Sequence, residues 1–517
     1  MSRINTNVAS LIGQHVLGHN NTSLNTSLER LSTGLRINRG KDDPAGLIAS
    51  ENLRAEKTAL DTAIGNAERA DQVANIAEGG LDEVSRLLNE LQGLLTQTAN
   101  DGGLSQEEKQ ANQLQIDSIL QTIDRVADAT SFQGTKLLNG NFDYTTTNVS
   151  GQVAAFNVNG AKLSFGETRN VEVLVYGSAQ AAGYLLSFGG DLDLGSAGEQ
   201  FVVEIAGALG SRELSFASGT SLADIAAAIN SFSDVVGVNA TVSTNLTSIR
   251  LDSTGYGSDQ FVSIKVVDDG NIAAGDGIHS LAIADTATAQ AGATAFTTTA
   301  AANGLTDFGQ DVEATINGIV ATTKGTHVRI NTDFLDVELD LVYDTGAGAA
   351  NAAILGAFTA FTIEGGGADF QLAGRVDIAG RVSLGIQSVA ARNIGRSTVD
   401  INGTDFTYFL KDLSTGAALN VVDGNTDAAQ HVVEKSIKEI STLRGRLGAF
   451  QKNTVGATIR SLGIALENTT AAESVIRDAD FAEETAKLTR GQILVSSATQ
   501  ILAIANSQPQ NALQLLG

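Results

Sequence analysis

The feature that most constrains the fold is a helical pattern of apolar residues that continues from Pro44 to about Asn100. Asp43 and Pro44 suit the start of such a helix, the aspartate as the N-cap and the proline at the first helical position, where no hydrogen bond is lost. At about 1.5 Å per residue, this helix would be roughly 85 Å long. Such helices are uncommon in globular domains, so the pattern predicts an elongated helical bundle.

The residues before this helix have the spacing of a coiled coil, in which leucines alternate at steps of four and three. These leucines are Leu24, Leu28, Leu31 and Leu35. Gly34 suits the C-terminus of the helix because glycine readily adopts the left-handed conformation. We therefore expect a helix from near Ile4 to about Ser32.

Two further helical segments complete the predicted bundle. Ser105 and Glu108 form a capping box, and an apolar face follows to about Ala129. The helical period returns near Asp427 and continues to about Leu466. Because both ends of the chain supply helices, we expect them to share one bundle.

The segment from Asp478 to Gly517 predicts a terminal amphipathic helix. Asp480 is placed to cap its start, with Glu483 as the return partner, and Pro509 is expected to end it. An apolar stripe on a thin terminal helix has little core of its own, so we expect it to pack between subunits. The residues predicted to do so are Leu24, Leu28, Leu31, Leu35, Leu488, Ile493, Leu494, Ile501, Leu502, Leu513, Leu515 and Leu516.

The centre of the chain predicts strands. Apolar residues alternate in segments such as VEVLVY (171–176) and FVVEIAG (201–207), and Ser221 is placed to cap an embedded helix. Two-residue hairpin turns are expected at the Asn-Gly pairs Asn159-Gly160, Asn317-Gly318 and Asn402-Gly403.

Together these patterns predict an α+β fold, with long terminal helices in a coiled-coil bundle and an inserted β-rich region. We expect an inner coiled coil from residues 1–43 and 478–517, and a long-helix bundle with a β-hairpin from residues 44–142 and 425–477. Residues 143–424 are expected to form one or two surface-exposed outer domains, about 143–300 and 301–424 if there are two.

The composition argues against several classes of function. A formal net charge of −25 repels nucleic acid and anionic membranes, so neither is expected as a partner. With no cysteine in the chain, disulfides and thiolate metal sites are excluded. The first residues lack the apolar run of a signal peptide, so we expect a cytosolic protein or export without a cleaved signal.

No catalytic pattern stands out, and we expect no enzymatic activity, cofactor or metal. His15 and His19 lie four residues apart, which can suit Zn²⁺, but no metalloprotease carboxylate accompanies them. We interpret both as exposed polar residues. The alternative is an enzyme carried in the central insert. Activity of the purified protein on peptides or glycans would support this alternative.

Ordered motifs stand at both ends of the chain. They are SLERLSTGLRIN (27–38), KDDPAGLIAS (41–50), IDRVADATSFQGTKLLNG (123–140), STLRGRLGAFQKN (441–453) and the residues from RGQILVSS to QNALQLLG (490–517). These motifs resemble those of bacterial flagellin, the flagellar filament subunit. The stretch from Phe201 to Val267 is similar to an insertion module of some flagellins and hook-associated proteins.

The resemblance implies a structural subunit of an extracellular filament for motility, exported unfolded through the flagellar type III apparatus. In flagellins the terminal segments pair into an inner helical layer, and the central insert projects outward. The implied partners are other copies of the chain, an export chaperone that binds the C-terminal helical region, and the hook-associated and cap proteins. The alternative is a hook–filament junction protein, which shares the terminal helices.

The resemblance also bears on receptor recognition. Stimulatory flagellins are recognised by Toll-like receptor 5 at a motif that maps onto Asn89, Glu90 and Leu94, with Gln and Arg at the first two positions. This chain has a shorter amide at Asn89 and the opposite charge at Glu90, whereas Leu94 is kept. Loss of an arginine anchor commonly costs about 2 kcal/mol or more. We therefore expect weak or absent activation of the receptor.

Overall fold

The computed structural model describes residues 6–100, 102–164, 166–195, 198–243, 247–272, 277–281, 292–342, 355–401 and 404–516. At residues 399–401, 404–405 and 509–516 only the backbone is described. The chain divides into two compact units, one of Met1–Glu78, Phe370–Arg381 and Arg444–Gly517, the other of Gly79–Asp369 and Val382–Leu443. Within the described residues, no helix has the length and apolar character needed to span a membrane.

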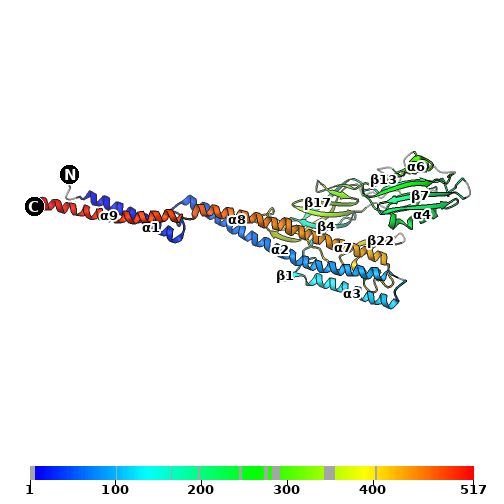
Figure 1. Cartoon of the computed structure of the whole chain (residues 1–517), viewed down its shortest axis with the longest axis horizontal. Coiled ribbons are helices and arrows are strands. Elements are labelled where there is room, and N and C mark those ends of the chain that lie inside the picture. The colour runs from blue at the N-terminus through cyan, green and yellow to red at the C-terminus, as the bar shows by residue number, and fades with distance from the viewer. Residues whose placement is uncertain are drawn as a thin grey trace. The chain divides into compact units, whose positions relative to one another are not determined.

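The first unit is made mainly of helices from both ends of the chain (Figure 1). They are α1 (Val8–Thr33), the first part of α2 (Pro44–Thr98), the last part of α7 (Thr426–Ala449), α8 (Gly456–Arg477) and α9 (Phe481–Leu516). The predicted caps are present: Asp43 Oδ1 accepts the Gly46 N–H at 2.9 Å, and Asp480 Oδ1 accepts the Ala482 N–H at 2.8 Å. Gly34 ends α1 in the left-handed conformation, as predicted.

Helix α9 continues through Pro509, so the predicted stop at this residue is wrong. Proline removes one intrahelical hydrogen bond, the one that its own nitrogen would donate to the carbonyl four residues earlier. That carbonyl belongs to Ala505, and it accepts a hydrogen bond from the Asn7 side chain at 2.8 Å instead. A partner from a helix far away in sequence thus offsets part of the cost of the proline.

A π-helical turn, η2 (Phe450–Val455), joins α7 to α8. Both end residues, Phe450 and Val455, are buried, so the inward positions step by five residues here instead of three or four. A π turn inserts one residue into a helical repeat. The third long segment predicted from the sequence is therefore two α-helices joined in this way.

In the second unit, the rest of α2 packs with α3 (Gln106–Ala129). The capping box of Ser105 and Glu108 is present, as predicted. The Asn112 side chain of α3 donates to Thr98 Oγ1 of α2 at 3.0 Å, and apolar residues of both helices are fully buried. A short hairpin of β1 (Ser131–Phe132) and β2 (Thr135–Lys136) follows α3.

One β-rich part of this unit has two antiparallel sheets around a shared core that includes Phe361. The first sheet has the order β15-β14-β5-β19-β3 and the second β16-β17-β18-β4. Their bounds are β3 (Tyr144–Thr147), β4 (Val153–Ala161), β5 (Arg169–Gly177), β14 (Glu313–Ile316), β15 (Ile319–Val320), β16 (Thr322–Lys324), β17 (His327–Asn331), β18 (Leu335–Leu341) and β19 (Gly356–Gly366).

A second β-rich part has its own core, which includes Phe201. Its sheets have the orders β12-β6-β10-β9 and β13-β11-β7-β8. The bounds are β6 (Gly183–Ser187), β7 (Gln200–Gly207), β8 (Gly210–Ala217), β9 (Val238–Val242), β10 (Ser248–Ser253), β11 (Phe261–Asp268), β12 (Gly277–Ser280) and β13 (Leu305–Phe308). Helix α4 (Leu222–Asn230) begins after its predicted cap, Ser221.

The remaining elements are short. They are α5 (Ser233–Val236), α6 (Thr299–Asn303), β20 (Ala368–Gln371), β21 (Arg381–Leu384), β22 (Ser397–Ile401), β23 (Thr404–Tyr408) and the 3-10 helix η1 (Leu410–Leu413).

The Asn-Gly pairs have different outcomes. Asn317 and Gly318 form the turn between β14 and β15, both with positive φ, as predicted. The turn predicted at Asn159-Gly160 is wrong, because both residues lie inside β4. The pairing of β4 with β18 shifts register at this point, so the pair occupies a bulge instead of a turn. Asn402-Gly403 lies outside the described residues.

Candidate assembly surface

Helices α1 and α9 lie side by side and antiparallel (Figure 1). Their buried and half-buried positions alternate at steps of three and four residues, the spacing of a coiled-coil seam. On α1 these positions are Ser10, Gly13, Leu17, Asn20, Leu24, Ser27 and Leu31. On α9 they are Glu484, Leu488, Gly491, Val495, Ala498, Leu502 and Ala505.

Small residues let the two helices approach closely along this seam. A Cβ atom added at Gly13 would lie 3.2 Å from Leu502 Cδ1, and one added at Gly491 would lie 3.3 Å from Leu24 Cδ1. The fully buried positions on both helices carry glycine, serine, alanine or Glu484. The seam is therefore close-packed at these positions, and its leucines and Val495 are only half-buried.

A buried ion-pair cluster fixes the register of the pair. Glu484 has a side chain that is only 5% exposed, and its Oε1 lies 3.2 Å from Arg30 Nη1 and 3.0 Å from Lys487 Nζ. Burial raises the pKa of Glu484, but hydrogen bonds from Lys487, Arg30 and Ser27 outweigh it and hold the pKa below its usual value. The carboxylate is thus charged at neutral pH.

Backbone hydrogen bonds connect the two helices where α1 ends and α9 begins. Arg36 N–H donates to Arg477 O at 2.7 Å, and Ala479 N–H donates to Gly34 O at 2.9 Å. Leu35 lies in this bridge, opposite Asp478. The start of α9 is therefore fixed to the end of α1 by main-chain hydrogen bonds, independently of the side chains of the seam.

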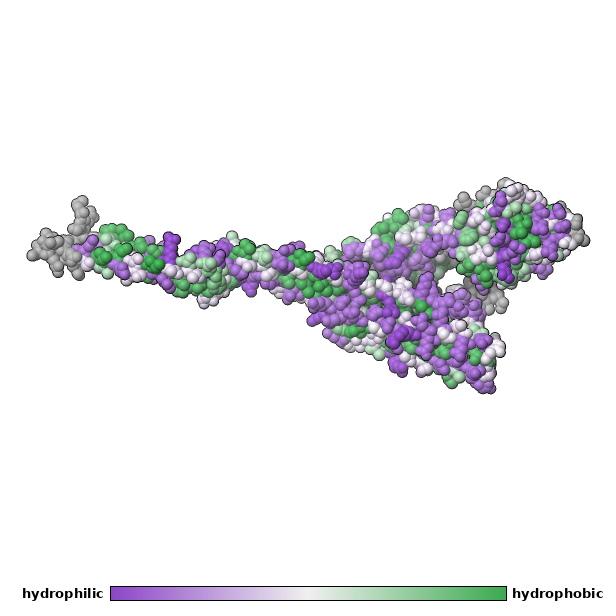
Figure 2. All heavy atoms as spheres, viewed as in Figure 1, coloured by the Kyte–Doolittle hydropathy of each residue, from purple (hydrophilic) through white to green (hydrophobic). Residues whose placement is uncertain are grey.

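Large apolar side chains lie on the outside of the pair (Figure 2). They are Val8, Leu11, Ile12, Val16 and Leu28 on α1, and Phe481, Ile493, Leu494, Ile501 and Ile504 on α9. Ile493 is 61% exposed and Ile501 is 60% exposed. We name these ten residues the outer apolar face. Such exposed apolar residues make the outside of the pair a candidate interaction surface.

The residues predicted to pack between subunits lie in different parts of the helix pair. Leu24, Leu31, Leu488 and Leu502 are half-buried in the seam. Leu28, Ile493, Leu494 and Ile501 belong to the outer apolar face, so Leu28 does not lie in the seam as its spacing predicts. Leu35 follows the end of α1. The side chains of Leu513, Leu515 and Leu516 lie outside the described residues.

The small seam residues were missed by the sequence analysis, which followed the large apolar residues. A signal was available, because the small residues Gly491, Ala498 and Ala505 recur at steps of seven residues. A strict seven-residue repeat of small residues is typical of a close-packed coiled coil.

The residues at the receptor-motif positions lie on α2. Asn89 and Glu90 are exposed and Leu94 is half-buried. The Asn89 side chain donates to Ser85 O at 2.9 Å on the same helix. The two positions that depart from the stimulatory pattern are thus on the accessible side of α2 in this chain.

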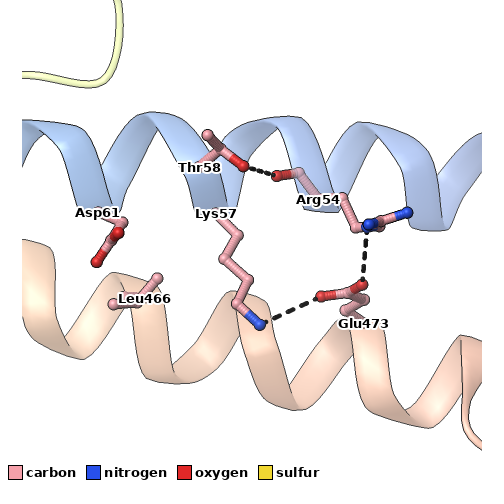
Figure 3. Close-up of a pocket in the computed structure, with 6 residues that line it drawn as sticks. All are labelled: Arg54, Lys57, Thr58, Asp61, Leu466 and Glu473. Carbon is pink, nitrogen blue, oxygen red and sulfur yellow. Dashed lines mark hydrogen bonds and ion pairs between the residues drawn. The ribbon is translucent and has the colours of Figure 1, made fainter.

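A pocket between α2 and α8 is lined by charged residues (Figure 3). Arg54 and Lys57 point from α2 toward Glu473 of α8, with Arg54 Nε 3.8 Å and Lys57 Nζ 3.6 Å from its carboxylate oxygens. The Glu473 side chain is 16% exposed. The charges of Arg54 and Lys57 are partly neutralised by Glu473, so we assign the pocket a structural role in holding α2 against α8.

His15 and His19 are exposed on α1. Across the part of the chain that the structure describes, no group of three or more histidine, aspartate or glutamate side chains is placed to hold a metal ion. The outer apolar face is the candidate functional surface of the helix pair.

Known proteins match the chain at both ends and along its length. Residues 4–143 match the bacterial flagellin N-terminal helical region, residues 431–516 the bacterial flagellin C-terminal helical region, and residues 201–255 the flagellin hook IN motif. Flagellin A of Helicobacter pylori is 28% identical over 541 aligned positions, and flagellin D of Vibrio anguillarum is 29% identical over 514. Each alignment covers 99% of both chains. The chain therefore belongs to the bacterial flagellins, the structural subunits of the extracellular flagellar filament.

Proposed function

We propose that the chain polymerises head-to-tail into the filament by packing the outer apolar face of α1 and α9 against the same helices of neighbouring subunits. The observation that carries this proposal is the distribution of side chains: the buried seam positions carry small residues or Glu484, the seam leucines are only half-buried, and ten large apolar residues are exposed outside. A self-contained helix pair would have the opposite distribution. The role is mechanical, and no catalytic activity is part of the proposal.

The energetics favour ordering on assembly. Fixing the backbone costs about 1–2 kcal/mol per residue, and buried apolar surface returns about 25 cal/mol per Å². The large apolar residues of the seam are only half-buried, so the seam alone does not offset this cost for two helices. Packing of the outer apolar face against neighbouring subunits supplies the missing burial. A contact between different surfaces that does not close on itself produces a helical filament instead of a ring.

Export belongs to the same proposal. Chain ends that order only on assembly stay unfolded in the free monomer, and the absence of cysteine prevents disulfides that would obstruct passage of an unfolded chain. We propose that an export chaperone covers the C-terminal helical region, because Ile493, Leu494 and Ile501 are exposed on α9 even when it is paired with α1. The cap and hook-associated proteins are the further proposed partners.

The test is seeded polymerisation of the full chain beside a truncation that ends at Arg477 and lacks α9. Sedimentation and electron microscopy should show long filaments of the full chain and none of the truncation. Thermal unfolding of the β-rich part should be the same in both, which controls for misfolding. Short rings from the full chain would favour the junction protein, and filaments from both chains would place the assembly surface elsewhere.

We further propose weak or absent activation of Toll-like receptor 5. Glu90 presents a negative charge where recognised members present arginine, on an exposed part of α2. In a reporter-cell assay, monomeric protein should give little response, and the double substitution Asn89→Gln with Glu90→Arg should increase it. A wild-type response equal to that of a strong agonist would refute the proposal.

A further inference from the structure

Asn7 connects the start of α1 to α9 through both ends of its amide. Its Oδ1 accepts the backbone N–H of Ser10 at 3.0 Å, which caps α1. Its Nδ2 donates to the backbone oxygen of Ala505 on α9 at 2.8 Å. Asn7 is half-buried and Ala505 is 7% exposed, so the hydrogen bond between them lies in the seam, shielded from solvent.

The position of the acceptor matters because Ala505 is four residues before Pro509. In a regular helix the N–H of residue 509 would donate to this oxygen, but proline has no N–H. A backbone carbonyl that is buried without a partner costs about 1–3 kcal/mol. Ala505 O is thus the acceptor that the sequence of α9 itself leaves free, and the Asn7 amide occupies it.

A second contact holds the same register. Ser10 Oγ donates to Asn506 Oδ1 at 2.6 Å, one residue after the Ala505 acceptor. Beyond these contacts, α9 continues past Pro509 to Leu516. The last turns of α9 therefore come directly after Ala505, the residue whose carbonyl accepts the hydrogen bond from Asn7.

We propose that Asn7 is a positioning residue for assembly, an amide clasp that caps α1 and takes the carbonyl freed by Pro509, so that the end of α9 stays helical only when α1 is in register. The clasp couples the ordering of the two chain ends. It rests on the proposed function, because these ends order when subunits assemble. Pro509 is the second residue on which the clasp depends, since without an N–H it cannot donate the hydrogen bond that the Ala505 carbonyl would otherwise accept within α9.

The test is a double-mutant cycle in the full chain, with the critical concentration for seeded polymerisation as the readout. Asn7→Ser keeps a capping oxygen without the long amide donor. It should raise the critical concentration about fivefold, the factor that corresponds to one net hydrogen bond. In the Pro509→Ala background the helix supplies its own N–H, so Asn7→Ser should change the critical concentration by less than about twofold. Asn21→Ser, at an exposed position of α1, is the control.

Hydrogen exchange in the assembled filament gives a second readout. Asn7→Ser should speed exchange in residues 506–516, and Pro509→Ala should restore protection. Equal effects of Asn7→Ser in both backgrounds, or no effect in either, would overturn the clasp alone. A wild-type chain that forms no filament would count against the proposed function, and the inference would fall with it.

Discussion

The helix pair α1–α9 and the β-rich core around Phe201 use apolar residues in opposite ways. The β-rich core buries large side chains such as Phe201, which is 1% exposed and packs edge-to-face on Phe188 at a centroid distance of 5.6 Å. The pair buries Gly13, Gly491 and Ala498 and leaves large apolar residues outside. The first region carries its own stabilisation, whereas the second leaves apolar surface exposed for the packing between subunits that we propose.

The difference predicts that substitutions in the two regions separate folding from assembly. A core substitution should lower the free energy of unfolding and leave polymerisation intact. A substitution on the outer apolar face should do the reverse.

The largest expected effect is on folding of the β-rich part. Phe201→Ala should lower its free energy of unfolding by about 3–5 kcal/mol, because it creates a cavity among fully buried residues. Calorimetry of the purified monomer measures this change. Phe308→Ala is the control in the same part of the chain, since Phe308 is 65% exposed, and it should cost less than about 1 kcal/mol. Loss of filament formation in Phe201→Ala protein below its melting temperature would contradict the separation.

Assembly should depend on the outer apolar face. Ile501→Ser should weaken the subunit interaction by about 1.5–3 kcal/mol, the contribution of burying one large aliphatic side chain. The critical concentration for polymerisation should therefore rise by at least about tenfold. Monomer melting should not change, because Ile501 is 60% exposed within one chain. Ile501→Leu keeps the apolar surface and should polymerise nearly as well as the wild type.

Sequence signals that depend on residues close together in the chain predicted the structure correctly, whereas features that depend on distant residues were missed. The caps at Asp43 and Ser105 were predicted because donor and acceptor lie within three residues of each other. The bulge at Asn159-Gly160 depends on pairing with β18, which is distant in sequence, so the local turn signal was misleading. The passage of α9 through Pro509 depends on Asn7 at the other end of the chain.

The assembly surface was predicted only in outline. The leucine spacing located the helices that pair, but it placed Leu28 in the seam, where the structure has Ser27. The choice between these positions depends on which residues allow close approach of α9, and that is a property of both helices together.

The close approach itself can be tested at a glycine. Gly13→Leu should overpack the seam against Leu502, which costs about 1–3 kcal/mol and is offset in part by about 1 kcal/mol of helix propensity. The critical concentration should rise by a few-fold. Gly18→Leu is the matched control, because apart from its chain neighbours and the backbone of its own helix no atom lies within 4 Å of a Cβ added there. Equal behaviour of the two variants would show that α1 and α9 do not pack closely in the filament.

The smallest expected effect is an acid sensitivity of the helix pair. The pKa of Glu484 in the folded pair is below its value in the unfolded chain, where the usual value is 4.5. A group with a lowered pKa stabilises the folded state above its unfolded pKa, and this contribution is lost as the pH falls through the folded pKa. The contribution of Glu484 should therefore be complete near neutral pH and decrease below about pH 4.5.

Substitution at Glu484 isolates this contribution from those of other carboxylates. Filaments of Glu484→Gln should be less stable to heat than the wild type at pH 7, because Arg30 and Lys487 lose their anionic partner in the seam. The difference should shrink as the pH is lowered below about 4.5, where the wild-type carboxylate also becomes neutral. Glu483→Gln is the control, since the Glu483 side chain is 65% exposed although it lies 2.9 Å from the same Lys487. If both variants have the same pH dependence, the buried position of Glu484 has no special role. If only Glu484→Gln loses the difference in acid, the charge buried among small residues is what fixes the register of α1 against α9.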